Sequence, residues 1–209
     1  MNIIMTGSTS FVGAATVREL LRRGHTVTAI VRPKSSKLDT ILEGNEEALL
    51  SGRLLVTEND LSEPEKLLEK VTKPQDVFCH FGWGGSGSAS RTDKALQEKN
   101  MEISLETIRT AKALGCKKFL FSGSQAEYGM HQDLITENTV CEPKSLYGEA
   151  KLAMREKGEK LCDELGLRYI HARIFSAYGP GDHPWTLVES CLDIFLSNKE
   201  MSLGACTQK

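Results

Sequence analysis

The sequence predicts an α/β fold, a doubly wound parallel sheet in which strands and helices alternate along the chain. Short apolar runs of strand length alternate with longer segments whose apolar residues have the spacing of amphipathic helices. A chain of 209 residues fits one such domain with a small appendage. The alternation itself indicates parallel strands, because a parallel pair needs a crossover connection and a helix usually supplies it.

The expected elements follow one another in a regular order. The apolar runs expected to form strands are Asn2–Thr6, Thr26–Val31, Arg53–Val56, Asp76–Phe81, Lys118–Ser122 and Arg168–Phe175. The segments with helical spacing are Phe11–Arg23, Pro64–Val71, Thr92–Leu114 and Ser145–Leu165. Gly24 and Gly115 each follow a helix at the position where a helix commonly ends in a left-handed residue.

The composition excludes several classes of protein. Apolar residues make up 40% of the chain, enough for a packed core, and a net charge of -2 gives no basic field for nucleic acid or anionic lipid. No apolar run approaches the roughly 20 residues of a membrane span, and the first strand begins so early that we expect no signal peptide. The cysteines and histidines show no metal-binding spacing, so we expect no metal site and a cytoplasmic location.

The stretch Thr6–Gly13 lies between the first expected strand and the first expected helix. Gly7 is expected to permit a tight turn and Gly13 to let helix and strand pack closely. The amino end of the helix then faces a pyrophosphate with free N–H groups and a positive dipole. Ser10 stands where a middle glycine is expected, and its small side chain either fits or lowers the affinity. The stretch predicts a Rossmann-type dinucleotide site; an ordinary turn is the alternative.

Tyr147 and Lys151 form the second motif. Residues four apart share a helix face, so we expect the Lys151 ammonium to lie near the Tyr147 hydroxyl, where it can also bond a nicotinamide ribose. A nearby positive charge lowers the tyrosine pKa from about 10 and lets Tyr147 exchange a proton with a substrate near neutral pH. Alone, the pattern is common by chance, and a solvated amphipathic helix is the alternative.

Two further segments lie at carboxyl ends of expected strands, where open α/β sheets bind ligands. Ser124 is placed to polarise the substrate oxygen that Tyr147 protonates, while Ser122 is expected only to cap its strand. The glycine-rich segment Gly82–Ser88 is expected to lie near the ligand; a flexible surface loop is the alternative.

Together these motifs resemble the extended short-chain dehydrogenase/reductase family, the NAD-dependent epimerases and dehydratases of nucleotide sugars. The resemblance runs from Met1 to about Asp182 and rests on the order and spacing of Thr6–Gly13, Asp60-Leu61, Val77–Gly82, Asn100, Phe119–Gly129, Tyr147–Lys151 and Arg173–Asp182. It implies catalytic roles for Ser124, Tyr147 and Lys151 and a supporting role for Asn100. It also implies a homodimer with a four-helix interface formed by the segments Thr92–Leu114 and Ser145–Leu165 of both copies; packing of their apolar residues within one chain is the alternative.

The resemblance further implies contacts with cofactor and substrate. Cofactor contacts are implied for Gly7, Phe11, Val12, Asp60, Leu61, Lys151 and Ile174. We also expect them for Ser10, Gly13, Arg32, Phe81 and Gly82. Substrate contacts are expected for Trp83, Gln125 and Ser176, the last at a place where the family often has asparagine.

The expected domain division follows from the same resemblance. Residues 1–182 are expected to form the NAD(P)-binding Rossmann domain, and residues 183–209 the start of a substrate-binding lobe. Members of the family usually continue much further. The resemblance therefore implies that this lobe is largely absent from the chain, through truncation or degeneration.

The end of the second expected strand bears on the choice of cofactor. NAD-selective domains place an acid there to hold the ribose 2′-hydroxyl, but this strand ends at Val31 and Arg32 without a carboxylate. Arg32 offers a planar fork suited to a 2′-phosphate, and Ser35, Ser36 and Lys37 add donors. We therefore predict that NADP is preferred over NAD. The alternatives are solvated charges or stacking of Arg32 on adenine.

The leading prediction is a nicotinamide-dependent epimerase or 4-keto reductase acting on a nucleotide-linked sugar. The family's 4,6-dehydratases carry an Asp-Glu pair where this chain has Gln125 and Ala126, so we expect no dehydratase activity. The alternative is a non-catalytic NAD(P)-binding sensor or regulatory protein with a degenerate substrate lobe. The intact catalytic trio favours the enzyme, whereas Ser10 and the short carboxyl end favour the sensor.

Overall fold

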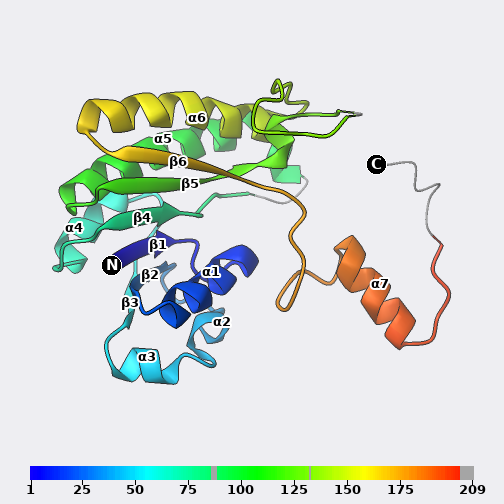
Figure 1. Cartoon of the computed structure of the whole chain (residues 1–209), viewed down its shortest axis with the longest axis horizontal. Helices are drawn as coiled ribbons and strands as arrows, with labels where there is room; N and C mark the ends of the chain where they lie inside the picture. The colour runs from blue at the N-terminus through cyan, green and yellow to red at the C-terminus, as the bar shows by residue number, and fades with distance from the viewer. Residues whose placement is uncertain (86–88, 132, 203–209) are drawn as a thin grey trace.

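The fold is a parallel six-stranded sheet with helices on both faces (Figure 1). The computed structural model describes residues 1–85, 89–131 and 133–202. The strands are β1 (Asn2–Thr6), β2 (Thr26–Val31), β3 (Leu54–Glu58), β4 (Val77–His80), β5 (Lys118–Ser124) and β6 (Arg168–Ile174). They lie in the order β3-β2-β1-β4-β5-β6 and every neighbouring pair is parallel. The predicted doubly wound, Rossmann-like fold is confirmed.

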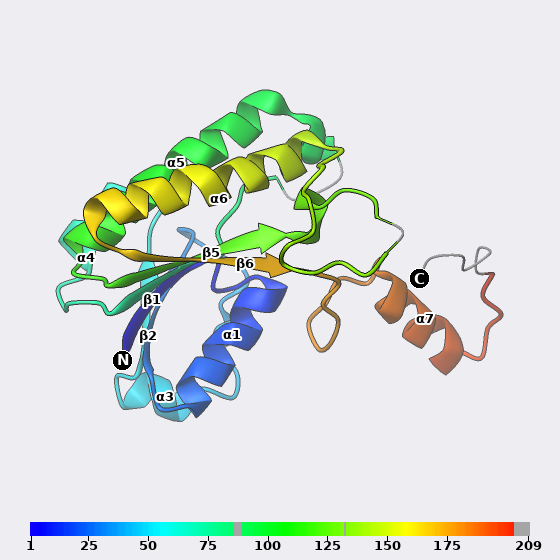
Figure 2. The same ribbon diagram turned by 45° about the horizontal axis from the view of Figure 1, so that its top comes forward.

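Figure 2 shows α5 and α6 side by side on one face of the sheet and α1 on the other. The α-helices are α1 (Phe11–Arg22), α2 (Asp39–Leu42), α3 (Glu46–Leu50), α4 (Leu67–Lys70), α5 (Lys94–Ala113), α6 (Leu146–Leu165) and α7 (Leu187–Leu196). Short 3₁₀ turns form η1 (Pro64–Lys66), η2 (Ala89–Thr92) and η3 (Gln125–Glu127). In the part of the chain that the structure describes, no helix is long and apolar enough to cross a membrane.

Local sequence explains where the long helices begin and end. The Asp93 side chain accepts a hydrogen bond from the Leu96 N–H and caps α5, which therefore begins two residues later than predicted. Gly24 and Gly115 adopt the predicted left-handed conformation after α1 and α5, with φ of 79° and 88°. The helix predicted from Pro64 divides into η1 and α4. The one-turn helices α2 and α3 are too short to give a periodic pattern.

Two strands are longer at their carboxyl ends than predicted, because pairing with a neighbour continues. β3 pairs with β2 as far as Glu58. β5 continues to Ser124, which pairs with Ile174 of β6. The second extension matters for the site, since it makes Ser124 part of the sheet rather than of a loop.

The buried core has one part on each face of the sheet. On β1, Ile4 belongs to the cluster that includes Phe78 and Phe119, whereas Ile3 and Met5 belong to the opposite cluster. This alternation follows from the two-residue period of a strand, so β1 contributes side chains to both parts of the core. The chain leaves β1 toward β2 on one side and later reaches β4 on the other, so a crevice opens between the two directions at the carboxyl ends.

α7 and the segment leading to it lie away from the sheet (Figures 1 and 2). Trp185, Leu192 and Leu196 are exposed there. The predicted domain boundary at residue 182 precedes this segment and stays a prediction, and residues 203–209 of the predicted lobe lie outside the described residues.

Candidate active site

The loop between β1 and α1 approaches the end of β4 closely. Gly7 has a left-handed backbone with φ of +69°, and a Cβ there would lie 2.7 Å from the carbonyl carbon of Phe81 and 2.8 Å from the amide nitrogen of Gly82. A Cβ on Gly13 would collide with the Gly7 carbonyl oxygen. Both glycines are therefore required by close backbone contacts, as the loop motif predicts.

Ser10, the departure from the glycine motif, is the N-cap of α1. Its hydroxyl donates to the Gly7 carbonyl oxygen at 2.8 Å and accepts from the Gly13 N–H at 3.1 Å. The N–H groups of Phe11 and Val12 belong to the first turn and have no acceptor within the helix. Ser10 thus uses one donor of the helix end and leaves the two adjacent ones for a ligand.

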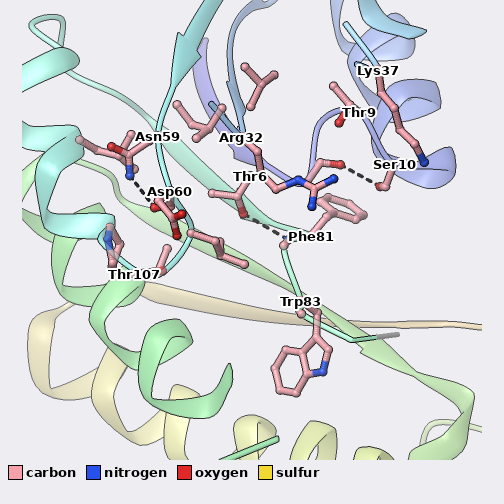
Figure 3. Close-up of a pocket in the computed structure, with 18 of the residues that line it drawn as sticks. Thr6, Thr9, Ser10, Arg32, Lys37, Asn59, Asp60, Phe81, Trp83 and Thr107 are labelled. Carbon is pink, nitrogen blue, oxygen red and sulfur yellow. Dashed lines mark hydrogen bonds between the residues drawn. The ribbon is translucent and has the colours of Figure 1, made fainter. Parts of the chain in front are cut away.

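A cavity of about 360 Å³ lies between this loop and the carboxyl ends of β2 and β3 (Figure 3). The predicted cofactor residues that line it are Gly7, Ser10, Arg32, Asp60, Leu61, Phe81 and Gly82. In Figure 3, Arg32 reaches into it from the end of β2. Hydrogen bonds from the side chain and backbone of Ser62 lower the pKa of Asp60, which is therefore an anion at neutral pH. We call this space the loop cavity.

A second cavity of about 1410 Å³ adjoins the first, and Ser10, Phe81 and Trp83 line both. The predicted residues that line it also include Phe11, Val12, Ser124, Gln125, Tyr147, Lys151 and Ile174. We call it the catalytic cavity. The structure thus gathers the expected cofactor and catalytic side chains along one edge of the sheet.

Some predicted residues lie elsewhere. Ser176 is exposed after β6 and lines neither cavity, because the chain turns away there toward α7. Gly13 lies inside α1 and acts through packing. The predicted ligand loop Gly82–Ser88 borders the loop cavity through Gly85, and residues 86–88 lie outside the described residues. Within the described ranges, no cluster of His, Cys, Asp or Glu side chains is arranged to hold a metal ion.

Tyr147 and Ser124 meet at the carboxyl end of β5. Ser145 caps α6 and so places Tyr147 in the first helical turn, where its phenol hydrogen-bonds with Ser124. Burial raises the pKa of Tyr147, and it outweighs the hydrogen bond with Ser124 and the positive charge of Arg91, which act to lower it. The predicted lowering of this pKa by Lys151 is not what the structure shows.

Lys151 lies one turn further along α6 and is only 2% exposed. Its Nζ donates to the Ser122 carbonyl oxygen at 2.7 Å and lies 5.7 Å from the centre of the Tyr147 ring. Burial lowers the pKa of Lys151 to about 7. The predicted shared helix face is confirmed, but the amine is held by the strand rather than by the phenol.

Two buried amides of α5 hold the loop after β4. The Trp83 indole N–H donates to Gln97 Oε1 at 2.9 Å, and Gln97 Nε2 donates to the Ser90 carbonyl oxygen at 2.8 Å. The Asn100 side chain accepts from the Gly84 N–H at 3.0 Å and donates to its carbonyl oxygen at 2.8 Å. Asn100 therefore supports the site through backbone, as the resemblance implies. Gln97 belongs to no motif and is not among the residues expected at the site. The sequence feature that could have indicated it is an amide on the apolar face of a predicted helix.

A chain of buried hydrogen bonds joins the strand before the loop to α5. Thr6 Oγ1 lies 2.8 Å from His80 Nδ1, and His80 Nε2 lies 3.1 Å from Ser104 Oγ. Ser104 donates to the Asn100 carbonyl oxygen at 2.8 Å. Burial lowers the pKa of His80 to about 3, so the ring is neutral and contributes hydrogen bonds without charge.

A buried charge cluster supports Ser124 from within the sheet. Glu127 accepts from the Ser124 N–H at 2.7 Å, from Arg173 Nε at 2.7 Å and from His171 Nε2 at 2.9 Å. Burial alone would raise the pKa of Glu127, but the hydrogen bonds from His171 and Arg173 outweigh it and hold the pKa below its ordinary value. Elements far apart in sequence thus fix the turn that carries the candidate catalytic hydroxyl.

Comparison with known proteins adds the following. The model of the NAD dependent epimerase/dehydratase family matches residues 3–204. The chain is 30% identical over 175 residues to dTDP-6-deoxy-L-talose 4-dehydrogenase (NAD(+)) of Aggregatibacter actinomycetemcomitans, covering 81% of this chain and 60% of that protein.

Solved structures give the same picture of the fold. A UDP-glucose 4-epimerase matches with a TM-score of 0.78 at 25% identity, covering 96% of this chain and 62% of that one. The UDP-glucuronic acid 4-epimerase of Bacillus cereus in complex with NAD matches with a TM-score of 0.74 at 22% identity, covering 95% and 65%. This chain therefore spans 60–65% of the length of these similar proteins.

Proposed function

Because the chain belongs to the NAD dependent epimerase/dehydratase family, we propose that it binds a nicotinamide dinucleotide beside a nucleotide-linked sugar and acts as an epimerase or a 4-keto reductase. The observation that carries this proposal is the meeting of Ser124, Tyr147 and Lys151 in a cavity that adjoins the loop cavity. A hydroxyl, a phenol and an amine together are equipped to exchange a proton with an alcohol or ketone oxygen.

The residues around the loop cavity fit a dinucleotide. A Cβ at Gly7 would fill the space through which the chain approaches β4, and the amino end of α1 presents the Phe11 and Val12 N–H groups to a pyrophosphate. Phe81 and Trp83, which line both cavities, mark the passage that a two-part cofactor would span. When bound, the nicotinamide supplies the acceptance or return of a hydride at a sugar carbon.

The chain's own residues handle the proton. In this proposal Ser124 and Tyr147 bind the reacting oxygen, and Tyr147 takes the hydroxyl proton when the sugar carbon is oxidised to a ketone and returns it on reduction. The raised pKa of Tyr147 favours the neutral phenol, which is the form that donates to a ketone oxygen. Arg91 is the cation that acts to lower the pKa of Tyr147, and Lys151 on the same helix face is a second positive charge near the phenol.

We expect the chain to lack 4,6-dehydratase activity. η3 follows Ser124 with Gln125 and Ala126, and neither side chain transfers a proton. Elimination of water from a hexose needs an additional acid and base at this place. Gln125 instead lines the catalytic cavity, where its amide is suited to bonding sugar hydroxyls. Conversion of a nucleotide-hexose to its 4-keto-6-deoxy product, detected by mass, contradicts this expectation.

We further propose that NADP binds more tightly than NAD. Arg32 and Lys37 both line the loop cavity, and the carboxylate of Asp60 in the same lining already accepts two hydrogen bonds from Ser62. A guanidinium at the end of β2 suits a 2′-phosphate. The similar talose dehydrogenase is named for NAD(+) and the similar UDP-glucuronic acid 4-epimerase was solved with NAD, so a titration of both cofactors decides this point.

The homodimer is proposed through α5 and α6. These helices lie side by side on one face of the sheet (Figure 2), an arrangement that two copies can extend to four helices. Light scattering of the purified chain at micromolar concentration tests the dimer. The cytoplasmic location expected from the cysteine pattern stays a prediction.

A single-turnover experiment tests the enzymatic proposal. The chain is mixed with stoichiometric NADP or NAD and a panel of nucleotide sugars, and the absorbance of the reduced nicotinamide is followed. We expect an absorbance change with at least one sugar and none in the Tyr147→Phe variant. Binding of cofactor and sugars without any absorbance change contradicts the proposal and favours the non-catalytic sensor.

A further inference from the structure

The buried charge of Lys151 has few polar partners. Its Nζ donates to the Ser122 carbonyl oxygen, and among the described residues it has no ion pair with a carboxylate. The amine otherwise meets aromatic faces: Nζ lies 4.0 Å from the centre of the Trp83 ring and 4.6 Å from that of Phe121. A cation over an indole face is attracted by the ring quadrupole, most strongly where water is excluded. Trp83 is therefore the nearest ring that stabilises this charge.

Side chains of α5 fix the orientation of the Trp83 ring. Gln97, only 2% exposed, accepts the indole N–H and is itself anchored to the Ser90 carbonyl oxygen. Asn100 clamps the backbone of the following residue, Gly84. The indole also forms a T-shaped contact with Tyr147, with ring centres 6.3 Å apart and planes at 86°. One oriented ring thus touches both members of the Tyr147–Lys151 pair.

We propose that Trp83, oriented by Gln97, is a positioning residue that stabilises the ammonium form of Lys151 and so sets the pH range in which Lys151 and Tyr147 work together. Removing the indole takes away the quadrupole while Lys151 stays buried, so the ammonium becomes less stable. This role replaces the direct substrate contact expected for Trp83. Its kinetic test rests on the proposed function, whereas its spectroscopic test needs no substrate.

Other ionisable groups face Lys151 or the rings around it. They are Tyr147 on α6, His80 on β4, Arg91 on η2, Glu127 on η3 and His171 on β6. The pKa of His80, about 3, lies far below neutrality. His171 stacks on Phe121 with ring centres 5.5 Å apart, on the strand beyond. A response of Trp83 near neutral pH is therefore assigned to Lys151 only if it disappears when Lys151 is removed.

The spectroscopic test uses the fluorescence of Trp83. The chain has two tryptophans, and the other, Trp185, is 75% exposed, so a Trp185→Phe chain isolates the signal. We expect the emission to titrate in one step near the pKa of Lys151, about 7. The step is absent in Lys151→Met. A step that persists in Lys151→Met, or no step in the parent chain, overturns the proposal.

The role of Gln97 has a matched control. Gln97→Met keeps the size of the side chain but removes the acceptor, so the indole is released, its emission shifts to the red and the titration step is lost. Gln75→Met removes another buried amide, at the opposite end of the sheet beside β4, and should leave both features unchanged. Unchanged emission and titration in Gln97→Met contradict the orienting role.

The kinetic test separates positioning from substrate binding. In Trp83→Leu the basic limb of the kcat profile, where Lys151 loses its proton, should move to lower pH by about one unit, and in Trp83→Phe by less, because a phenyl ring retains a weaker quadrupole. A raised KM with an unmoved profile means that Trp83 binds substrate and overturns the proposal. Absence of turnover in the parent chain refutes the proposed function instead, and the fluorescence result still decides this inference.

Discussion

The loop cavity and the catalytic cavity adjoin, yet they are built by different means. The loop cavity depends on backbone shape, above all on Gly7, which brings the chain against the end of β4. The catalytic cavity depends on buried polar side chains: Gln97 orients Trp83, and Glu127 with Arg173 supports Ser124. Changes in the first should therefore alter folding and cofactor affinity, and changes in the second should alter rates and pH dependence.

The largest effect is expected for Tyr147→Phe. Loss of a positioned acid and base should lower kcat by about 10²–10⁴-fold. The cofactor Kd should stay nearly unchanged, because only a hydroxyl is removed and Tyr147 lies outside the loop cavity. Tyr178→Phe removes the hydroxyl of an exposed tyrosine and serves as the control. Full activity in Tyr147→Phe with the parent pH profile would contradict the assignment of the acid/base role to Tyr147 and of catalysis to the catalytic cavity.

The next largest effect concerns stability. Glu127→Gln leaves Arg173 buried without its anion, and should lower the free energy of unfolding by about 3 kcal/mol in urea titrations. Glu19 also pairs with two cations, Arg22 and Arg23, but on the surface, so Glu19→Gln should change stability little. Equal effects of the two substitutions contradict the importance of the buried cluster.

The same cluster has a predictable pH dependence. Because the folded-state pKa of Glu127 is below its ordinary value of 4.5, its stabilisation is fully present above that value and is lost as the pH falls through the folded-state pKa. Unfolding free energies measured across the acid range should fall less steeply in Glu127→Gln than in the parent chain. Parallel curves exclude this linkage.

Gly7→Ala tests whether the loop cavity depends on backbone shape. The left-handed φ alone costs about 1–2 kcal/mol for alanine, and the contact with Phe81 and Gly82 adds to it. Gly24→Ala has a similar φ, +79°, but open space around the added Cβ, so it should show the strain alone. Cofactor affinity should fall only in Gly7→Ala. Equal losses of stability, with unchanged affinity in both, refute the close approach as the reason for Gly7.

The smallest effect is expected at Arg32. Arg32→Ala should weaken NADP about tenfold and NAD little, because a charged hydrogen bond to the 2′-phosphate is lost. Lys34→Ala removes a nearby charge that does not line the loop cavity and is the control. Calorimetric titration of both cofactors measures the difference. Equal weakening of both by Arg32→Ala indicates stacking on adenine instead.

Much of the fold follows from the sequence because strand and helix periods differ and the segments are long enough to show them. The succession of strands along the chain, the two long helices and the glycine ends of α1 and α5 agree with expectation. The extension of β5 to Ser124 does not follow from periodicity, since it depends on pairing with β6. α7 is absent from the predicted helices although its apolar residues have helical spacing, and in Figure 1 it lies away from the sheet.

The site divides in the same way. The roles of Gly7 and Gly13 can be predicted from the sequence because they depend on local backbone contacts. The helix spacing also correctly predicts that Tyr147 and Lys151 share one face. The direction in which the Tyr147 pKa shifts cannot be predicted from the sequence, because burial determines it and burial depends on the whole fold. The supporting role of Glu127 cannot be predicted either, since its partner Arg173 lies 46 residues away in sequence.

In the proposed function, a sugar bound in the catalytic cavity exchanges a hydride with the nicotinamide and a proton with Tyr147. The most direct measurement uses a nucleotide sugar deuterated at the reacting carbon, incubated with the chain and the oxidised cofactor. We expect the recovered reduced cofactor to carry the deuterium, as seen by mass, and Tyr147→Phe to give no labelled cofactor. Bound cofactor that stays oxidised and unlabelled beside every nucleotide sugar that binds would contradict it.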